Sequence, residues 1–175
     1  MKKIKYYILT FLIIALFGCS EEYSLEDQGI TLAELPGYVA FDAPGTSTNL
    51  VAFNAAESDD NLKIKVEVPT GTLSNVLVGY SLSGTAIFGT DYTISDADSS
   101  GGTLVIPHIQ STDPTFSVPD FAEIEIDFLI DNVADGDKTI VITLLSASND
   151  EKTLAVGRGG TDFLKTATVN IADVD

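Results

Sequence analysis

Hydrophobic and polar residues alternate in short runs along most of the chain after residue 36, which predicts β-strands. The alternation is strongest in residues 123–130 and 139–144, where every second residue is Ile, Phe or Leu. Between them, residues 131–137 form an acidic stretch that contains the turn signal Asp135–Gly136. This pattern predicts a hairpin-like pair of half-buried antiparallel strands joined by an acidic turn.

Other short apolar or alternating stretches predict further strands, and no stretch keeps a helical period. Turn-forming residues separate these stretches, and residues 107–120 and 146–164 are predicted to be loops. Many short strands in one domain favour an all-β fold, an antiparallel two-sheet β-sandwich. The predicted additional strands are residues 38–41, 50–53, 62–68, 76–82, 91–94, 103–106 and 166–171.

The first eighteen residues have the composition of an export signal rather than of a folded element. Three lysines precede an apolar run over residues 6–17, which is too short to span a membrane comfortably. Gly18–Cys19 follows, and this ending resembles that of bacterial lipoprotein signals, in which the cysteine becomes the lipid-modified N-terminus. We therefore expect a signal peptide over residues 1–18 and lipidation of Cys19, with a plain secretion signal as the alternative. Cys19 is the only cysteine, which excludes a disulfide framework and a thiolate zinc site.

Residues 19–36 are acidic and lack apolar periodicity, so we expect a tether there and a folded domain over residues 37–175. The Ser20-Glu21-Glu22 sequence resembles the acidic signal that sends some Gram-negative lipoproteins to the outer cell surface. The expected location is the outer membrane of a Gram-negative bacterium, with the protein lipid-anchored and surface-exposed.

The charge balance restricts the possible partners. The chain has 26 acidic and 9 basic residues, for a formal net charge of −17. Nucleic acid is excluded as a partner because phosphate backbones require a positive surface. Anionic lipid would also repel the chain, so the lipid on Cys19 must hold it at the membrane. An acidic excess favours hard divalent cations such as calcium.

Enzymatic chemistry has little support in the sequence. His108 is the only histidine, and the only cysteine is assigned to lipidation, so nucleophile–base pairs are scarce. Two carboxylates could cleave a glycoside in principle, which leaves a carboxylate-based glycoside hydrolase as a minor alternative. The sequence therefore predicts a non-enzymatic protein with His108 at the surface.

Four segments of the chain carry recognisable motifs: GTAIFGTDY over residues 84–92, GTLVI over 102–106, DNVADGDKTIVITL over 131–144 and ATVNIADVD over 167–175. In this order they resemble the Calx-beta domain family, whose members are immunoglobulin-like β-sandwiches in sodium–calcium exchangers and bacterial surface proteins. The resemblance covers roughly residues 50–175. It implies that the strand over residues 62–68 neighbours the strand over residues 123–130, with Lys63 and Lys65 facing Glu123, Glu125 or Asp127.

The resemblance also implies a calcium site, because calcium-binding members gather carboxylates at one end of the sandwich. The sequence departs from the family pattern at Asn132 and Val174, where acids are common, and at Lys138, where a glutamate is usual. The alternative is that the aspartates of residues 131–137 are simply turn formers. The residues implied as metal ligands are Glu57, Asp91, Asp131, Asp135, Asp173 and Asp175.

These observations favour a non-enzymatic, surface-anchored lipoprotein module. It could be a binding or adhesion accessory with a protein or glycan partner, or a calcium-stabilised spacer, or a structural domain without metal.

Overall fold

The computed structural model describes residues 37–43, 51–108, 120–130 and 132–174, and the regular secondary structure of these residues is almost entirely β-strand. None of the helices among them is long and apolar enough to cross a membrane. A short 3₁₀ helix, η2 (Arg158–Gly160), precedes the last strand. The strands are β1 (Tyr38–Phe41), β2 (Val51–Ala56), β3 (Asn61–Val68), β4 (Val76–Gly84), β5 (Tyr92–Ile94), β6 (Ala97–Asp98), β7 (Gly101–Ile106), β8 (Asp120–Phe128), β9 (Lys138–Ser148), β10 (Thr153–Val156) and β11 (Thr166–Ala172).

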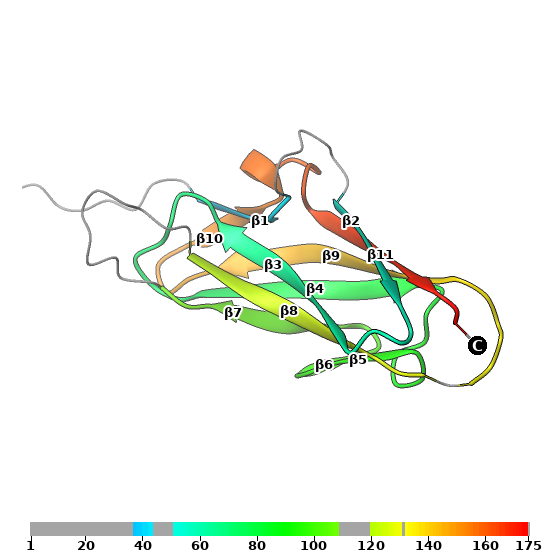
Figure 1. Cartoon of the computed structure of the whole chain (residues 1–175). Helices are drawn as coiled ribbons and strands as arrows, with labels where there is room; N and C mark the ends of the chain where they lie inside the picture. The colour runs from blue at the N-terminus through cyan, green and yellow to red at the C-terminus, as the bar shows by residue number, and fades with distance from the viewer. Residues whose placement is uncertain (1–36, 44–50, 109–119, 131, 175) are drawn as a thin grey trace, which may run out of the picture. The chain divides into compact units, whose positions relative to one another are not determined.

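The strands form two packed layers (Figure 1). One layer has the order β5-β8-β3-β1, and the other has the order β6-β7-β4-β9, with β10, β11 and β2 continuing beyond β9. Strand β1 joins the layers, because it pairs antiparallel with β3 and parallel with β10. The β2–β11 pair is also parallel, whereas the other ladders are antiparallel. The predicted all-β, immunoglobulin-like sandwich is therefore confirmed.

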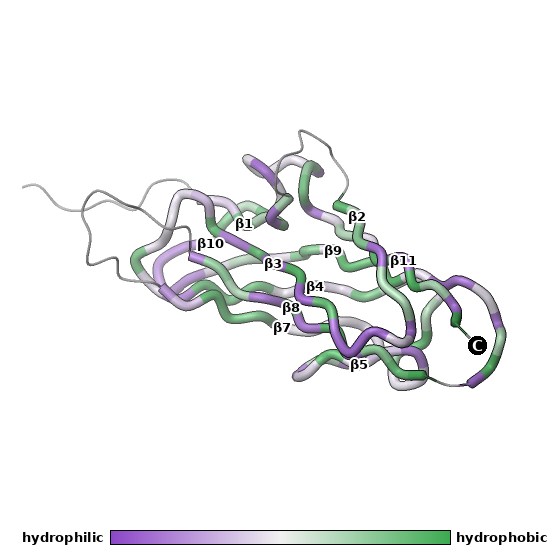
Figure 2. The backbone as a smooth tube through the Cα atoms, in the orientation of Figure 1, coloured by the Kyte–Doolittle hydropathy of each residue, from purple (hydrophilic) through white to green (hydrophobic). Residues whose placement is uncertain are grey.

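The core lies between the layers and consists of the residues that the alternation assigned to the inner faces. Hydrophobic positions alternate with hydrophilic ones along β3 and β8 (Figure 2). Burying each such side chain stabilises the fold by roughly 1.5–3 kcal/mol, which is why the period-two pattern persists. Buried core residues include Ile64, Val66, Ile124 and Ile126 from one layer and Val78, Ile140, Ile142, Leu144, Val169 and Ile171 from the other.

The predicted hairpin between residues 123 and 144 is wrong. Strand β8 pairs with β3 and β5, whereas β9 pairs with β4, β10 and β11 in the opposite layer. The connection over residues 129–137 therefore crosses from one layer to the other. Two strands that face each other across a core alternate in the same way as two strands of a hairpin, so periodicity alone cannot distinguish them. Ile130, which the alternation placed in the core, lies beyond β8 and is 55% exposed.

The predicted pairing of β3 with β8 is confirmed. Lys63 lies opposite Glu125 and Lys65 lies opposite Glu123. The Lys63 Nζ is 3.5 Å from the Glu125 Oε1. Lys65, however, forms its ion pairs with Asp42 at 3.0 Å and with Glu67 at 3.1 Å.

The predicted loop over residues 146–164 is also wrong, because it contains the end of β9, all of β10 and η2. Strand β10 is only four residues long, and Leu154 is its one buried residue, so it carries little periodicity of its own. Its strand geometry comes from pairing with β9 on one side and β1 on the other. Most of the loop predicted at residues 107–120 lies outside the described residues.

Candidate functional site

The described residues among the predicted metal ligands lie at one end of the sandwich, where the 132–137 loop and the C-terminal tail lie together (Figure 1). Glu57 follows β2, and its N–H donates to the Ala172 carbonyl at 3.2 Å. Asp91 immediately precedes β5, and Asp173 follows β11. Asp131 and Asp175 lie outside the described residues. We call this end the acidic tip and define it as residues 57–59, 85–91, 132–137 and 172–174, together with Lys138.

Asp91 is the most enclosed of these acids, with an exposed fraction of 0%. Its Oδ2 accepts the Ile87 N–H at 2.5 Å, and its Oδ1 lies 2.7 Å from the Lys138 Nζ. The surrounding backbone holds it in place, because its N–H donates to the Ile87 carbonyl and its own carbonyl accepts the Leu129 N–H. A buried carboxylate is tolerated only when it is hydrogen-bonded and its charge is compensated, and both conditions hold here.

Lys138 compensates the charge of Asp91 and also forms an ion pair with a second acid, Asp135. Its Nζ is also 2.6 Å from the Asp135 Oδ2, and its side chain is only 11% exposed. The hydrogen bonds that Lys138 donates to Asp135 and to Asp91 raise the pKa of Lys138 above its ordinary value, so the amine stays protonated. Because Asp91 adjoins β5 in one layer and Lys138 begins β9 in the other, this triad fastens the two layers at the tip.

Asp173 fastens the C-terminal tail to the same connection. Its Oδ2 accepts the Gly136 N–H at 2.6 Å, and its own N–H donates to the Asp137 Oδ1 at 3.2 Å. Gly136 has φ +88°, a left-handed conformation that glycine adopts without strain. The Asp135–Gly136 turn signal is thus real, but the turn binds the tail rather than closing a hairpin.

The tip as built fits an ammonium ion better than calcium. Calcium takes six to eight oxygen ligands at about 2.3–2.6 Å, and the Lys138 Nζ already lies between the oxygens of Asp91 and Asp135. In the described part of the chain, no group of three or more His, Cys, Asp or Glu side chains is placed to hold a metal. From the sequence alone, Lys138 was identified only as a departure from the glutamate that is usual at this position in the Calx-beta pattern. The signal for its role is a lysine three residues after an aspartate in a segment otherwise rich in acids.

His108 lies at the opposite end of the domain. Its Nδ1 is 3.4 Å from the Oδ2 of the buried Asp120, and its backbone N–H donates to the Asn75 Oδ1 at 2.9 Å. The same Asp120 oxygen accepts the Thr72 N–H at 2.9 Å. These contacts tie together the ends of β7 and β8 and the turn before β4. His108 is a partly exposed surface residue there, with its side chain 31% exposed.

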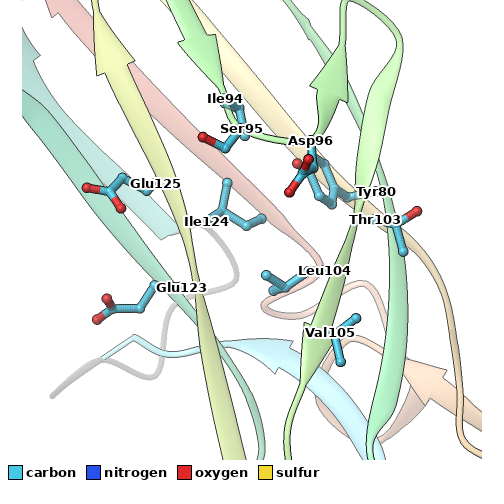
Figure 3. A pocket seen from close by; sticks show the side chains of 10 residues that line it. All are labelled: Tyr80, Ile94, Ser95, Asp96, Thr103, Leu104, Val105, Glu123, Ile124 and Glu125. Atoms are coloured by element: carbon cyan, nitrogen blue, oxygen red, sulfur yellow. The ribbon is translucent and has the colours of Figure 1, made fainter.

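A pocket of about 340 Å³ opens between β7 and β8 and bears on the glycoside hydrolase alternative. Three carboxylates line it, those of Asp96, Glu123 and Glu125. Ile124 points into the pocket, while the two glutamates on either side of it point away from Asp96 (Figure 3). Glu125 contacts Lys63 on the outer face of the layer. Glycoside hydrolysis needs two carboxylates that flank one bond, and these three do not converge.

Comparison with known proteins identifies the fold. No family model matches the sequence, and no curated protein matches it either. Among solved structures, the apo form of the Calx CBD1 domain has a TM-score of 0.54 and 21% identity, covering 79% of this chain and 98% of that one. The Calx CBD2 domain has a TM-score of 0.54 at 17% identity, covering 79% of this chain and 87% of that one.

A third solved structure, described as the calcium binding domain CBD12 of CALX1.1, has a TM-score of 0.51 and 24% identity. The match covers 71% of this chain and 42% of that one, so the chain spans less than half of CBD12. At these identities the likeness establishes the fold alone. The chain has a Calx-beta-like fold.

Proposed function

We propose that this chain is a non-enzymatic β-sandwich module, held by lipid on Cys19 at the outer membrane of a Gram-negative bacterium and exposed at the cell surface. It presents the acidic tip away from the membrane as a spacer or as a binding accessory for a surface protein or glycan. The Calx-beta-like fold supports a non-enzymatic module, since a solved structure of that fold is described as a calcium binding domain and not as an enzyme.

The position at which the chain enters the domain supports this orientation most directly. Ala40 of β1 lies opposite Glu67, near the last residue of β3, whereas Asn61 begins β3 immediately after the acidic-tip turn. Asn61 and Glu67 are six residues apart along β3, which is roughly 20 Å at about 3.3 Å per residue. Residue 37, where the described part of the domain begins, therefore lies toward the end of the sandwich opposite the acidic tip.

Lipidation provides the attachment in this proposal. Two or more acyl chains hold a protein stably in a bilayer, whereas one chain gives only reversible binding. Metabolic labelling with a fatty-acid analogue should tag the wild-type chain and leave Cys19→Ala untagged. Equal labelling of both chains would contradict the anchor.

The orientation is tested by energy transfer from the domain to the membrane. Ser58→Cys places a thiol at the acidic tip, and Glu151→Cys places one in the turn between β9 and β10 at the opposite end, with both positions exposed. Each variant is labelled on intact cells with a membrane-impermeant maleimide dye, and transfer to a membrane-bound acceptor is measured. We expect both positions to label and transfer to be stronger from position 151. Equal transfer from both positions would refute the orientation, and no labelling of either would refute surface exposure.

A calcium-stabilised spacer is the second candidate. The convergence of Glu57, Asp91, Asp135 and Asp173 at one end favours it, as does the likeness to a domain described as calcium binding. The position of Lys138 opposes it, because the ammonium already neutralises two of these acids. Thermal melting in millimolar calcium against chelator, at fixed ionic strength, distinguishes the two candidates, since only the second predicts a higher midpoint with calcium.

A further inference from the structure

The Lys138 side chain fills the place between two carboxylates that a metal ion would need. Its Nζ is 2.7 Å from the Asp91 Oδ1 and 2.6 Å from the Asp135 Oδ2. Both are the lengths of strong charge-assisted hydrogen bonds. With the side chain 11% exposed, little water competes for these contacts.

Asp91 requires a cation in this place. The carboxylate is fully buried, and its second oxygen is occupied by the Ile87 N–H. A backbone N–H carries only a partial charge, so it cannot by itself balance a full negative charge removed from water. Asp135 alone would worsen the imbalance, because it brings a second negative charge to the same point.

A divalent cation and the Lys138 ammonium exclude each other at this point. Calcium would lie about 2.3–2.6 Å from the same oxygens that the ammonium contacts at 2.6 and 2.7 Å. The two positive centres would overlap and repel each other. The lysine at position 138 therefore occupies the place between Asp91 and Asp135 that a metal ion would need.

We infer that the Lys138 ammonium is a built-in cation that holds the acidic tip together without metal, and that removing it exposes a site for a hard divalent cation. The covalent attachment keeps the cation present at any calcium concentration. The tip is then equally firm in calcium-rich and calcium-poor surroundings. This inference concerns how the tip is held and does not depend on the membrane anchor or its orientation.

The test compares the wild-type full chain with Lys138→Gln, both purified in mild detergent. Each is melted in chelator and in millimolar calcium at fixed ionic strength, and calcium binding is measured by titration calorimetry. The wild type should melt at the same temperature in both conditions and bind no calcium. Lys138→Gln should melt lower in chelator and recover by roughly 3–6 °C at ten times its dissociation constant, which we expect near 10⁻⁴–10⁻³ M.

Two further variants isolate the role of the charge at this position. Lys63→Gln removes the same charge from an exposed ion pair outside the tip, so it should show neither the lower midpoint nor the calcium response. Asp91→Asn/Lys138→Gln removes both charges of the buried pair, so it should fold in chelator and lose the calcium response.

Several results would overturn the inference. One is a wild-type chain that calcium stabilises as much as it stabilises Lys138→Gln. Another is a Lys138→Gln chain with no calcium response. If Lys138→Gln does not fold, even in calcium, failure of the Asp91→Asn/Lys138→Gln chain to fold would show that charge is not what the lysine supplies. Folding of that double variant alone would confirm the role of the ammonium and refute the latent metal site.

Discussion

Replacing Ile126 by alanine tests whether the core lies where the two layers meet. Ile126 is in the middle of β8 and is 0% exposed, so the substitution removes three buried carbon atoms. At about 0.8 kcal/mol per buried methylene, the lost transfer free energy is about 2.4 kcal/mol. The cavity adds about 1 kcal/mol if half of the vacated volume, on the order of 40 Å³, persists. We therefore expect the free energy of unfolding to fall by roughly 3.5 kcal/mol.

Ile130→Ala is the matched control, because the same alternation placed Ile130 in the core and the structure leaves it 55% exposed. Its cost should stay below about 1 kcal/mol, as for surface positions in general. Urea unfolding of the full chain in mild detergent, followed by circular dichroism, measures both variants. With a slope of about 2 kcal/mol per M, Ile126→Ala should lower the midpoint by roughly 1.7 M. Equal losses for the two variants would mean that β8 continues inward through residue 130, contrary to the structure.

Three other experiments test separate features. A double-mutant cycle of Lys63→Ala and Glu125→Ala should give a coupling energy of only about 0.2–1 kcal/mol, because both side chains are nearly half exposed; a larger value would mean a better shielded pair. Gly136→Ala should cost about 1 kcal/mol in urea unfolding, from the left-handed φ of +88° alone, because an added Cβ meets nothing within 4 Å; no loss would mean that the turn relaxes. Burial, then Asp96, raises the pKa of Tyr80 above its ordinary value of 10.0, so the unfolded chain ionises first and stability should fall as pH rises through 10. Tyr80→Phe should lose less stability over pH 9–11 than the wild type, and identical profiles would count against this assignment.

Local pattern was sufficient to predict the class of fold and most of its strands. Buried residues take every second position along most of β3, β9 and β11, as the alternation predicted, since alternation along a strand follows from the backbone geometry of that strand alone. The pairing of Lys63 with Glu125 came instead from the family resemblance, since alternation does not identify which strand lies next to which. The short β10 could not be predicted from its own sequence pattern, because its strand conformation depends on pairing with β9 and β1.

The sequence by itself determined that this chain is an acidic all-β protein with alternating strands, and its first nineteen residues predict a lipid-anchored export route. Only the tertiary structure decided that β8 and β9 lie in opposite layers and that the connection between them crosses the acidic tip. It also decided the partner of Asp91, since Lys138 lies 47 positions away in the chain. Strand periodicity depends on neighbours in the sequence, whereas the balance of a buried charge depends on whichever group the folded chain brings within contact.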